Sequence, residues 1–385
     1  MPWGNKTVEE LRGEFCARAQ RAENFSALCR EYGITRKTGY TWVEREERGE
    51  SLADRSRTPC RQPTKTLPEL EAKVVAQRIA HPAWGPKKIR KVLENQGEEG
   101  LPCVKTMGNI LKRNGCVSPE ASAKAKPVQR FEREKCNELW QTDFKGDFAL
   151  TGGGRCHPLT ILDDHSRFLL AGDIKSSPSG AIESFRKAFE EFGVPHSVLS
   201  DNGSAFRGLR GGFVAFERWL MEHDVLPIHG RVRHPQTQGK VERIHETMDV
   251  ELLAGKQFSD LQAVAEAYAL WRDEYNFVRP HEALDMRCPG DVYVKSERVY
   301  AEQVPAFQYS GEHRVTKVDS WGYARFAGFV SFLSDTFAGQ FLEFRANPLG
   351  GSDARGSWIA CFRSFRIAEF DAHSGQLINR SVRRL

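Results

Sequence analysis

The sequence lacks an apolar run that approaches the roughly 18–20 residues needed to cross a membrane. Its opening residues, MPWGNKTVEELRGEF, also lack the basic-then-apolar pattern of a secretory signal. The nine cysteines are an odd number, and no two of them form a C-x-x-C pair. We therefore expect a soluble, cytoplasmic protein with reduced thiols, and neither a disulfide framework nor a zinc finger.

The overall composition is that of an ordinary globular protein. Hydrophobic residues make up 40% and charged residues 28% of the 385-residue chain. This balance is typical of folded proteins, and the length predicts two to four domains because one core rarely grows so large.

The small net charge of +5 is unevenly distributed along the chain. Residues 1–137 hold 27 Lys and Arg against 18 Asp and Glu, whereas residues 138–385 hold 29 against 33. A basic first part favours a polyanionic partner held mainly by that part. A surface that is merely well solvated remains the alternative on charge alone.

Two helical segments precede residue 118, and both are basic. Residues 7–48 predict a helix capped by Thr7, a second helix, a turn at Gly33 and a third helix that presents Arg36 and Lys37 at its start. Residues 68–115 repeat the three-helix pattern, with basic positions at Lys87, Lys88 and Lys105. Tandem basic modules of this kind predict DNA binding, although a single one often serves only packing or oligomerisation.

The pattern changes to alternating strands and helices from residue 138. ELWQTDFKGDFAL reads as a strand, and two more strands follow it before helices and strands alternate. We expect a mixed five-stranded sheet with helices on both faces. After residue 294, short aromatic strands with Gly turns predict a small all-β domain.

The predicted organisation is thus multidomain, with all-α modules, an α/β core and an all-β end. Its expected segments are a helix-turn-helix module with a basic linker (1–62), a second such module (63–117), a linker (118–137), the α/β core (138–293) and a small β-barrel-like domain (294–385).

Three acidic residues stand out by their positions in the core. Asp143 lies inside the first strand, where a carboxylate is unfavourable without compensation, and Asp201 ends the fourth strand in SDNGSAF. Glu242 lies in the first turns of the helix that follows the fifth strand. If the first and fourth strands are neighbours, the two aspartates lie side by side, and the helix brings Glu242 over them.

Converging carboxylates repel one another, and hard divalent cations relieve that repulsion. Two ions about 3.5–4 Å apart activate an attacking oxygen and stabilise a leaving one in phosphodiester chemistry. The trio therefore predicts a two-ion site.

The segments LWQTDFKG, SDNGSAF, HPQTQGKVER and YNFVRPHEAL resemble the signature segments of DDE transposases of bacterial insertion sequences, which have a retroviral-integrase-like core. The resemblance implies a ribonuclease-H-like fold and Asp143, Asp201 and Glu242 as Mg²⁺ ligands, with Mn²⁺ able to substitute. It implies DNA cleavage by water and strand transfer by a 3′-hydroxyl at transposon ends, whose terminal inverted repeats the N-terminal modules would recognise. Double-stranded DNA is the implied partner, with a homo-oligomer on DNA in the bacterial cytoplasm.

Other candidate residues flank this trio. His234, Gln238, Lys240 and Arg243 surround Glu242 and are interpreted as phosphate contacts or as solvated side chains. Asp163 and Asp164 in ILDDHSR resemble a structural strand end, and HEALD, which nearly copies H-E-x-x-H, is interpreted as a helix start.

Two other functions compete with the transposase. One is a catalytically inactive, transposase-derived DNA-binding regulator, and the intact acidic trio speaks against it. The other is a ribonuclease-H-like nuclease that only hydrolyses, for which tandem helix-turn-helix modules would be superfluous.

Overall fold

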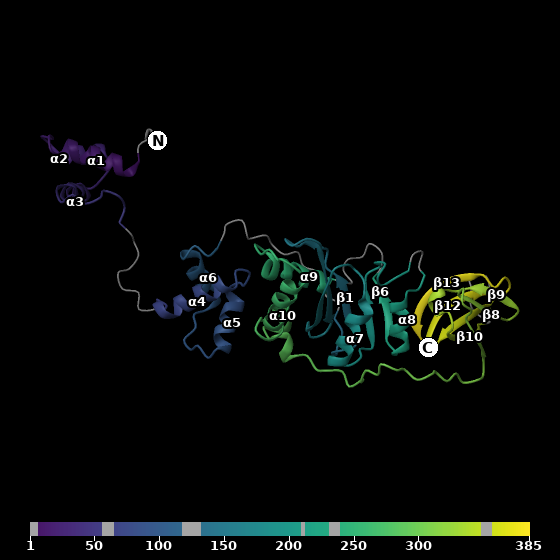
Figure 1. Ribbon diagram of the computed structural model, residues 1–385. Coiled ribbons are helices and arrows are strands. Elements are labelled where there is room, and N and C mark those ends of the chain that lie inside the picture. Colours follow the sequence, from purple (N-terminus) through teal and green to yellow (C-terminus); the bar gives the residue numbers. More distant parts are fainter. Residues whose placement is uncertain (1–6, 56–64, 118–131, 209–211, 231–238, 348–355) are drawn as a thin grey trace. The chain divides into compact units, whose positions relative to one another are not determined.

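The computed structural model describes residues 7–55, 65–117, 132–208, 212–230, 239–347 and 356–385 (Figure 1). Contacts divide the chain into two units, Met1–Lys65 and Thr66–Leu385. Within the described ranges, no helix is long and apolar enough to cross a membrane.

The first unit is a three-helix module. Its helices are α1 (Val8–Ala19), α2 (Phe25–Glu31) and α3 (Arg36–Glu47). Thr7 and Glu10 cap α1 reciprocally, since each side chain accepts the other's backbone N–H. Phe15 is fully buried against aromatic rings from α2 and α3. The predicted helix-turn-helix arrangement is therefore confirmed.

A second three-helix set opens the larger unit. It contains α4 (Pro68–Ala80), α5 (Pro86–Asn95) and α6 (Val104–Arg113). Proline stands at the start of α4 and α5, where its missing N–H removes no helical bond. Trp84, Ile89 and Ile110 are completely buried at the centre of this set.

A mixed sheet forms the middle of the larger unit. Its strands are β1 (Trp140–Phe144), β2 (Phe148–Ala149), β3 (Arg155–Asp163), β4 (Leu169–Lys175), β5 (Ser197–Ser200) and β6 (Leu226–His229). The main order is β4–β3–β1–β5–β6, and the two-residue β2 also pairs with β3. β3 is antiparallel to β1 and β4, whereas β5 is parallel to both β1 and β6. This is the expected five-stranded ribonuclease-H-like sheet with one short addition.

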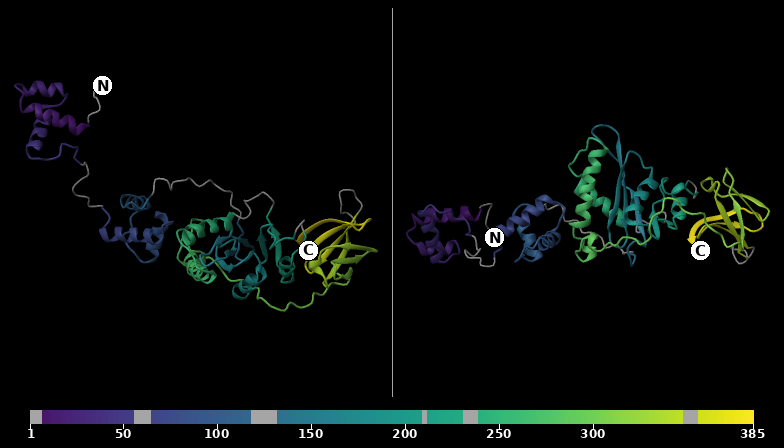
Figure 2. Two further views of the ribbon diagram at one scale, coloured as in Figure 1. Left: turned by 45° about the horizontal axis from the view of Figure 1, so that its top comes forward. Right: turned by 60° about the horizontal axis from the view of Figure 1, so that its bottom comes forward.

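Helices cover both faces of this sheet (Figure 2). On one face, α7 (Ala181–Phe192) and α8 (Ala215–Glu222) bury Phe185, Phe189 and Phe216 against Trp140 of β1. On the other face lie α9 (Gly239–Met248), the π-helical turn η4 (Asp249–Leu253) and α10 (Leu261–Phe277). The apolar sides of these helices hold the strand ends in fixed positions.

α10 approaches β4 closely at one glycine, and this contact yields a stability prediction. A Cβ on Gly172 would lie 1.7 Å from the ring of Tyr268, which is only 2% exposed. We expect Gly172→Ala to lower the free energy of unfolding by about 1–3 kcal/mol, the usual effect of overpacking. Urea unfolding measures it. Gly146→Ala, where a new Cβ meets nothing within 4 Å, should change stability little.

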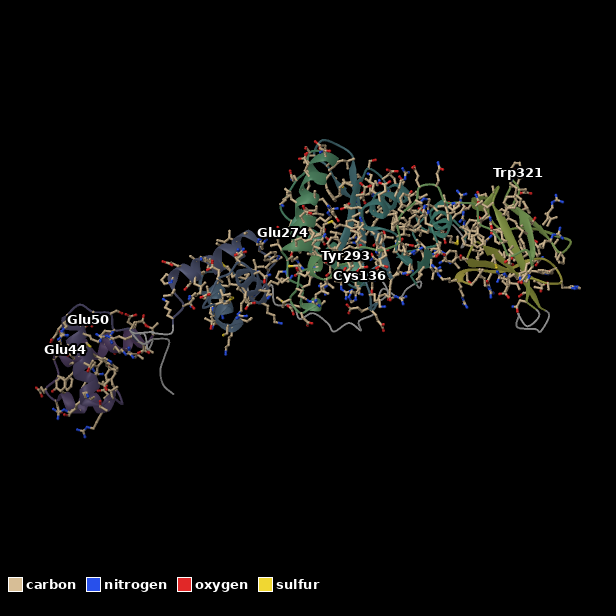
Figure 3. All side chains as sticks on the ribbon, turned by 90° about the horizontal axis from the view of Figure 1, so that it is seen from below. Glu44, Glu50, Cys136, Glu274, Tyr293 and Trp321 are labelled. Carbon is tan, nitrogen blue, oxygen red and sulfur yellow. The ribbon has the colours of Figure 1, made fainter. Side chains whose placement is uncertain are left out.

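The end of the chain is all β, as predicted. In the described part of this region, two short 3₁₀ turns, η5 (Glu282–Leu284) and η6 (Pro289–Asp291), are followed by seven strands and a further turn, η7 (Asp335–Phe337). The strands are β7 (Arg314–Lys317), β8 (Tyr323–Phe326), β9 (Phe329–Phe332), β10 (Phe341–Asn347), β11 (Ser357–Phe362), β12 (Phe365–Asp371) and β13 (Leu377–Arg384). They form a five-stranded antiparallel sheet and the β8–β9 hairpin. Trp321, just before the hairpin, is 78% exposed (Figure 3).

Candidate active site

The strand register brings two of the three predicted acids together. β1 and β5 pair through Trp140 with Val198 and Gln141 with Leu199. Continuing this parallel register by two residues places Asp143 beside Asp201. Asp143 is thereby held on a rigid central strand and Asp201 at the tip of its neighbour.

A compact turn holds Asp201 at the end of β5. Its carboxylate Oδ1 accepts the backbone N–H of Gly203 at 2.9 Å, and the Asn202 amide donates to the carbonyl of Gly230, also at 2.9 Å. A Cβ on Gly203 would approach that carboxylate to 3.0 Å. A side chain at this position would crowd the acid, whereas Gly203, two residues after Asp201, leaves room for it.

The third acid, Glu242, is an exposed residue in the first turns of α9. One turn further along, His245 points at the sheet: its Nδ1 lies 3.9 Å from Asp143 Oδ2, and its Nε2 lies 3.1 Å from Thr160 Oγ1. Burial lowers the pKa of His245 to about 4, so the ring is neutral at pH 7. α9 thus lies directly beside Asp143.

The charges of Asp201 and Glu242 act on the carboxyl group of Asp143. The pKa of Asp143 is raised to about 7, mainly by burial and further by the charges of Asp201 and Glu242. Such a shift marks a place where negative charge is crowded and only partly solvated. The site would therefore bind a cation favourably.

The chemistry of these side chains fits a divalent metal. Three carboxylates offer hard oxygen ligands, which Mg²⁺ and Mn²⁺ prefer, and the raised pKa of Asp143 is what a bound cation would reverse. Within the described ranges, no group of three or more His, Cys, Asp or Glu side chains is gathered tightly enough to hold an ion, so the structure brings Asp143 and Asp201 together but does not assemble a metal site from them and Glu242. The residues that would hold one are Asp143, Asp201 and Glu242.

The raised pKa of Asp143 predicts how pH and metal act on stability. Because its pKa is raised, Asp143 holds its proton more tightly in the folded than in the unfolded state. Its contribution to the free energy of unfolding is therefore full below about pH 4 and is lost as pH rises towards about 7. Mg²⁺ binds the ionised form. We expect Mg²⁺ to raise the melting temperature clearly at about pH 8 and much less at about pH 5.5.

Thermal unfolding with and without Mg²⁺ measures this effect. Asp143→Asn should abolish the difference between the two pH values. An equal Mg²⁺ shift at both values in the unmodified chain would contradict the linkage.

The predicted DNA contacts are distributed over several elements. The predicted contact residues with exposed side chains are Arg36, Lys37, Lys87, Lys105 and Arg243. Lys88 is half-buried, and burial lowers its pKa to about 8. His234 and Gln238 lie outside the described residues. Among the predicted contacts that the structure describes, Lys240 and Arg243 share α9 with Glu242, and Arg243 pairs with Glu246 at 2.9 Å.

The two aspartates of ILDDHSR form hydrogen bonds and an ion pair within the fold. Asp163 accepts the backbone N–H groups of Asn137 and Ser166 at 2.7 and 2.8 Å. Asp164 is fully buried and pairs with Lys240 at 2.6 Å. Lys240 is 14% exposed, and burial lowers its pKa to about 8.

A residue that sequence reasoning missed lies next to Asp201. His229 ends β6, and its Nδ1 lies 3.2 Å from Ser200 Oγ. Its Nε2 lies 2.8 Å from the carboxylate of buried Glu217. The only signal in the sequence is its place at the end of a strand parallel to the one that ends at Asp201.

Comparison with known families agrees with this architecture. Profiles described as "Integrase core domain" match residues 133–235 and 223–289, and a "Homeodomain-like domain" profile matches residues 38–111. The two integrase matches contain all three acids. The homeodomain-like match spans parts of both helical sets.

Several curated proteins and solved structures are similar to the chain. It is 26% identical over 254 residues to an insertion element IS407 protein of Burkholderia multivorans, covering 63% of this chain and 88% of that protein. It is 26% identical over 251 residues to an insertion element IS476 protein of Xanthomonas euvesicatoria, covering 62% and 69%.

Retroviral integrases appear among the solved structures. A simian T-cell lymphotropic virus intasome chain is 14% identical with a TM-score of 0.37, covering 81% of this chain and 98% of that one. The magnesium-bound HTLV-2 integrase core (trimeric form) is 16% identical with a TM-score of 0.31, covering 42% and 99%. These scores are too low to add to the assignment. The family profiles and these relatives show that the chain contains an integrase core domain and is similar to proteins of bacterial insertion elements.

Proposed function

We propose that this chain is a DDE-type transposase, which cleaves DNA at insertion-sequence ends and joins those ends to target DNA. The observation that carries the proposal is the parallel register of β1 and β5, which places Asp143 beside Asp201. The raised pKa of Asp143, whose causes include the charges of Asp201 and Glu242, supports it. A pKa that is shifted by burial and by specific neighbouring charges is typical of residues in functional sites. The integrase profiles supply the reaction class, because they span all three residues.

In the proposed reaction, Asp143, Asp201 and Glu242 would hold two Mg²⁺ ions, for which Mn²⁺ could substitute. When bound, such ions stabilise charge on phosphate oxygens and activate an attacking oxygen. The protein contributes the placement, since Asp143 and Asp201 belong to neighbouring parallel strands and Glu242 to a helix that contacts β1 and packs on β3. Water would be the nucleophile for cleavage and a 3′-hydroxyl for joining.

The helical modules are the proposed readers of the terminal inverted repeats. Arg36 and Lys37 are exposed at the start of α3, the second helix of the helix-turn-helix. In such motifs the early residues of this helix contact base edges in the major groove. Joining requires two ends, so we propose a homo-oligomer on DNA.

The test incubates the full chain with a labelled duplex carrying the element's terminal repeat, together with Mg²⁺ and target DNA. The proposal predicts nicks at the repeat boundary and then joined products. Binding without cleavage would indicate the inactive regulator, and cleavage without joining would indicate a nuclease.

A further inference from the structure

A buried ion pair joins the start of α9 to the end of β3. Lys240 Nζ lies 2.6 Å from Asp164 Oδ1, and it also donates to the backbone carbonyl of Asp164 at 2.8 Å. The Asp164 side chain is fully buried, and that of Lys240 is 14% exposed. Two bonds to one buried residue direct this ammonium towards the protein interior.

Asp164 is itself fixed by a residue of β1 and by a residue of the segment that precedes β1. Its carboxylate accepts the Gln141 amide at 2.6 Å and the Arg133 backbone N–H at 2.7 Å. Gln141 lies on β1, two residues before Asp143. Because a buried carboxylate is tolerated only when it is paired and hydrogen-bonded, Lys240 completes this arrangement.

The ion pair lies close to the third acid along the helix. Lys240 precedes Glu242 by two residues, about 3 Å of helical rise. Val241 and Ile244 are buried on the side of α9 that packs on the sheet, and His245 bonds Thr160 one turn later. The apolar contacts hold α9 against the sheet, while the Lys240 bonds fix the position of its first turn.

We propose that the Asp164–Lys240 ion pair positions Glu242 for divalent-metal binding, an inference that rests on Glu242 being a ligand as proposed above. Lys240 and Asp164 are then positioning residues, and Lys240 is not primarily a phosphate contact. Residues that orient a metal ligand typically change metal affinity 10–100-fold when they are replaced.

The test measures two quantities on the full chain: the Mg²⁺ concentration at half of the thermal stabilisation, and the affinity for terminal-repeat DNA without metal. Lys240→Gln and Asp164→Asn should each raise the Mg²⁺ midpoint about 10-fold or more and leave DNA affinity within about 2-fold. Lys240→Arg, which keeps the charge, should recover much of the loss.

A double variant keeps the test informative, since Lys240→Gln alone leaves a buried charge unpaired. Asp164→Asn with Lys240→Gln should raise the midpoint no more than the worse single variant, because both changes remove one interaction. Lys175→Gln is the matched control: it breaks a partly buried pair with Asp173, at 2.7 Å, at the end of β4. Its Mg²⁺ midpoint should equal that of the unmodified chain.

Provided that Glu242→Gln abolishes the stabilisation by Mg²⁺, either of two results would overturn the inference. One is an unchanged Mg²⁺ midpoint in the ion-pair variants. The other is a loss confined to DNA affinity, which would make Lys240 a phosphate contact. If Glu242→Gln itself keeps the normal Mg²⁺ stabilisation, the proposed metal site fails first, and the positioning role falls with it.

Discussion

Asp143→Asn, Asp201→Asn and Glu242→Gln should each reduce cleavage and joining of terminal-repeat DNA by about 10³-fold or more. Each change removes an anionic oxygen ligand while keeping the side-chain shape almost the same. Metal ions contribute several kcal/mol to stabilising charge in the transition state, and about 4 kcal/mol corresponds to 10³-fold in rate. Gel-based cleavage and strand-transfer assays with Mg²⁺ measure the loss.

End binding separates this effect from unfolding. All three variants should bind the terminal repeat nearly as tightly as the unmodified chain, because the proposed binding residues lie mainly in the N-terminal helices. Asp173→Asn is a suitable control, since Asp173 is a partly buried carboxylate on β4 with its own lysine partner. Full cleavage activity in any of the three site variants would remove that residue from the site.

DNA binding by the full chain should weaken by about 10³–10⁵-fold between 50 and 200 mM salt, if the two helical modules contact some 6–10 phosphates. Each neutralised phosphate adds about 0.9 to the slope of log K against log salt. The surplus of positive charge before residue 138, 27 basic against 18 acidic residues, supports contacts of this number. Fluorescence anisotropy over a salt series measures the slope.

Single substitutions show which residues contact the terminal-repeat DNA. Arg36→Ala and Lys105→Ala should both weaken binding, and a base-reading residue should also relax preference at one position at a cost of about 1–3 kcal/mol. Arg21→Ala removes the same charge from an exposed position after α1 and should weaken binding much less. A salt slope near zero, or equal losses in all three variants, would contradict recognition by these helices.

The sequence was sufficient to predict the arrangement of the core because its patterns are local. The apolar run before Asp201 indicates a buried strand, and β5 ends at Ser200, one residue before the expected end at Asp201. Thr7 and Glu10 predict the start of α1 by the same local logic. The expected strand ELWQTDFKGDFAL instead becomes two: β1 ends at Phe144, and β2 begins at Phe148 after a short irregular connection that contains Gly146.

The partners of polar side chains could not be predicted in this way. Lys240 looks like any exposed lysine at a helix start, and only the fold brings it to Asp164, 76 positions earlier in the chain. His229 and Glu217 likewise meet only because α8 packs beside β6. Such pairs depend on tertiary contacts, for which hydrophobic periodicity carries no signal.

The most direct test of the proposed metal site is a count of Mn²⁺ ions bound per chain, by electron paramagnetic resonance, with terminal-repeat DNA present. Above the Mn²⁺ that the same DNA binds alone, we expect two bound ions for the unmodified chain and a loss of bound Mn²⁺ in Asp143→Asn, Asp201→Asn and Glu242→Gln. Undiminished Mn²⁺ binding in all three variants, or none in the unmodified chain, would contradict it.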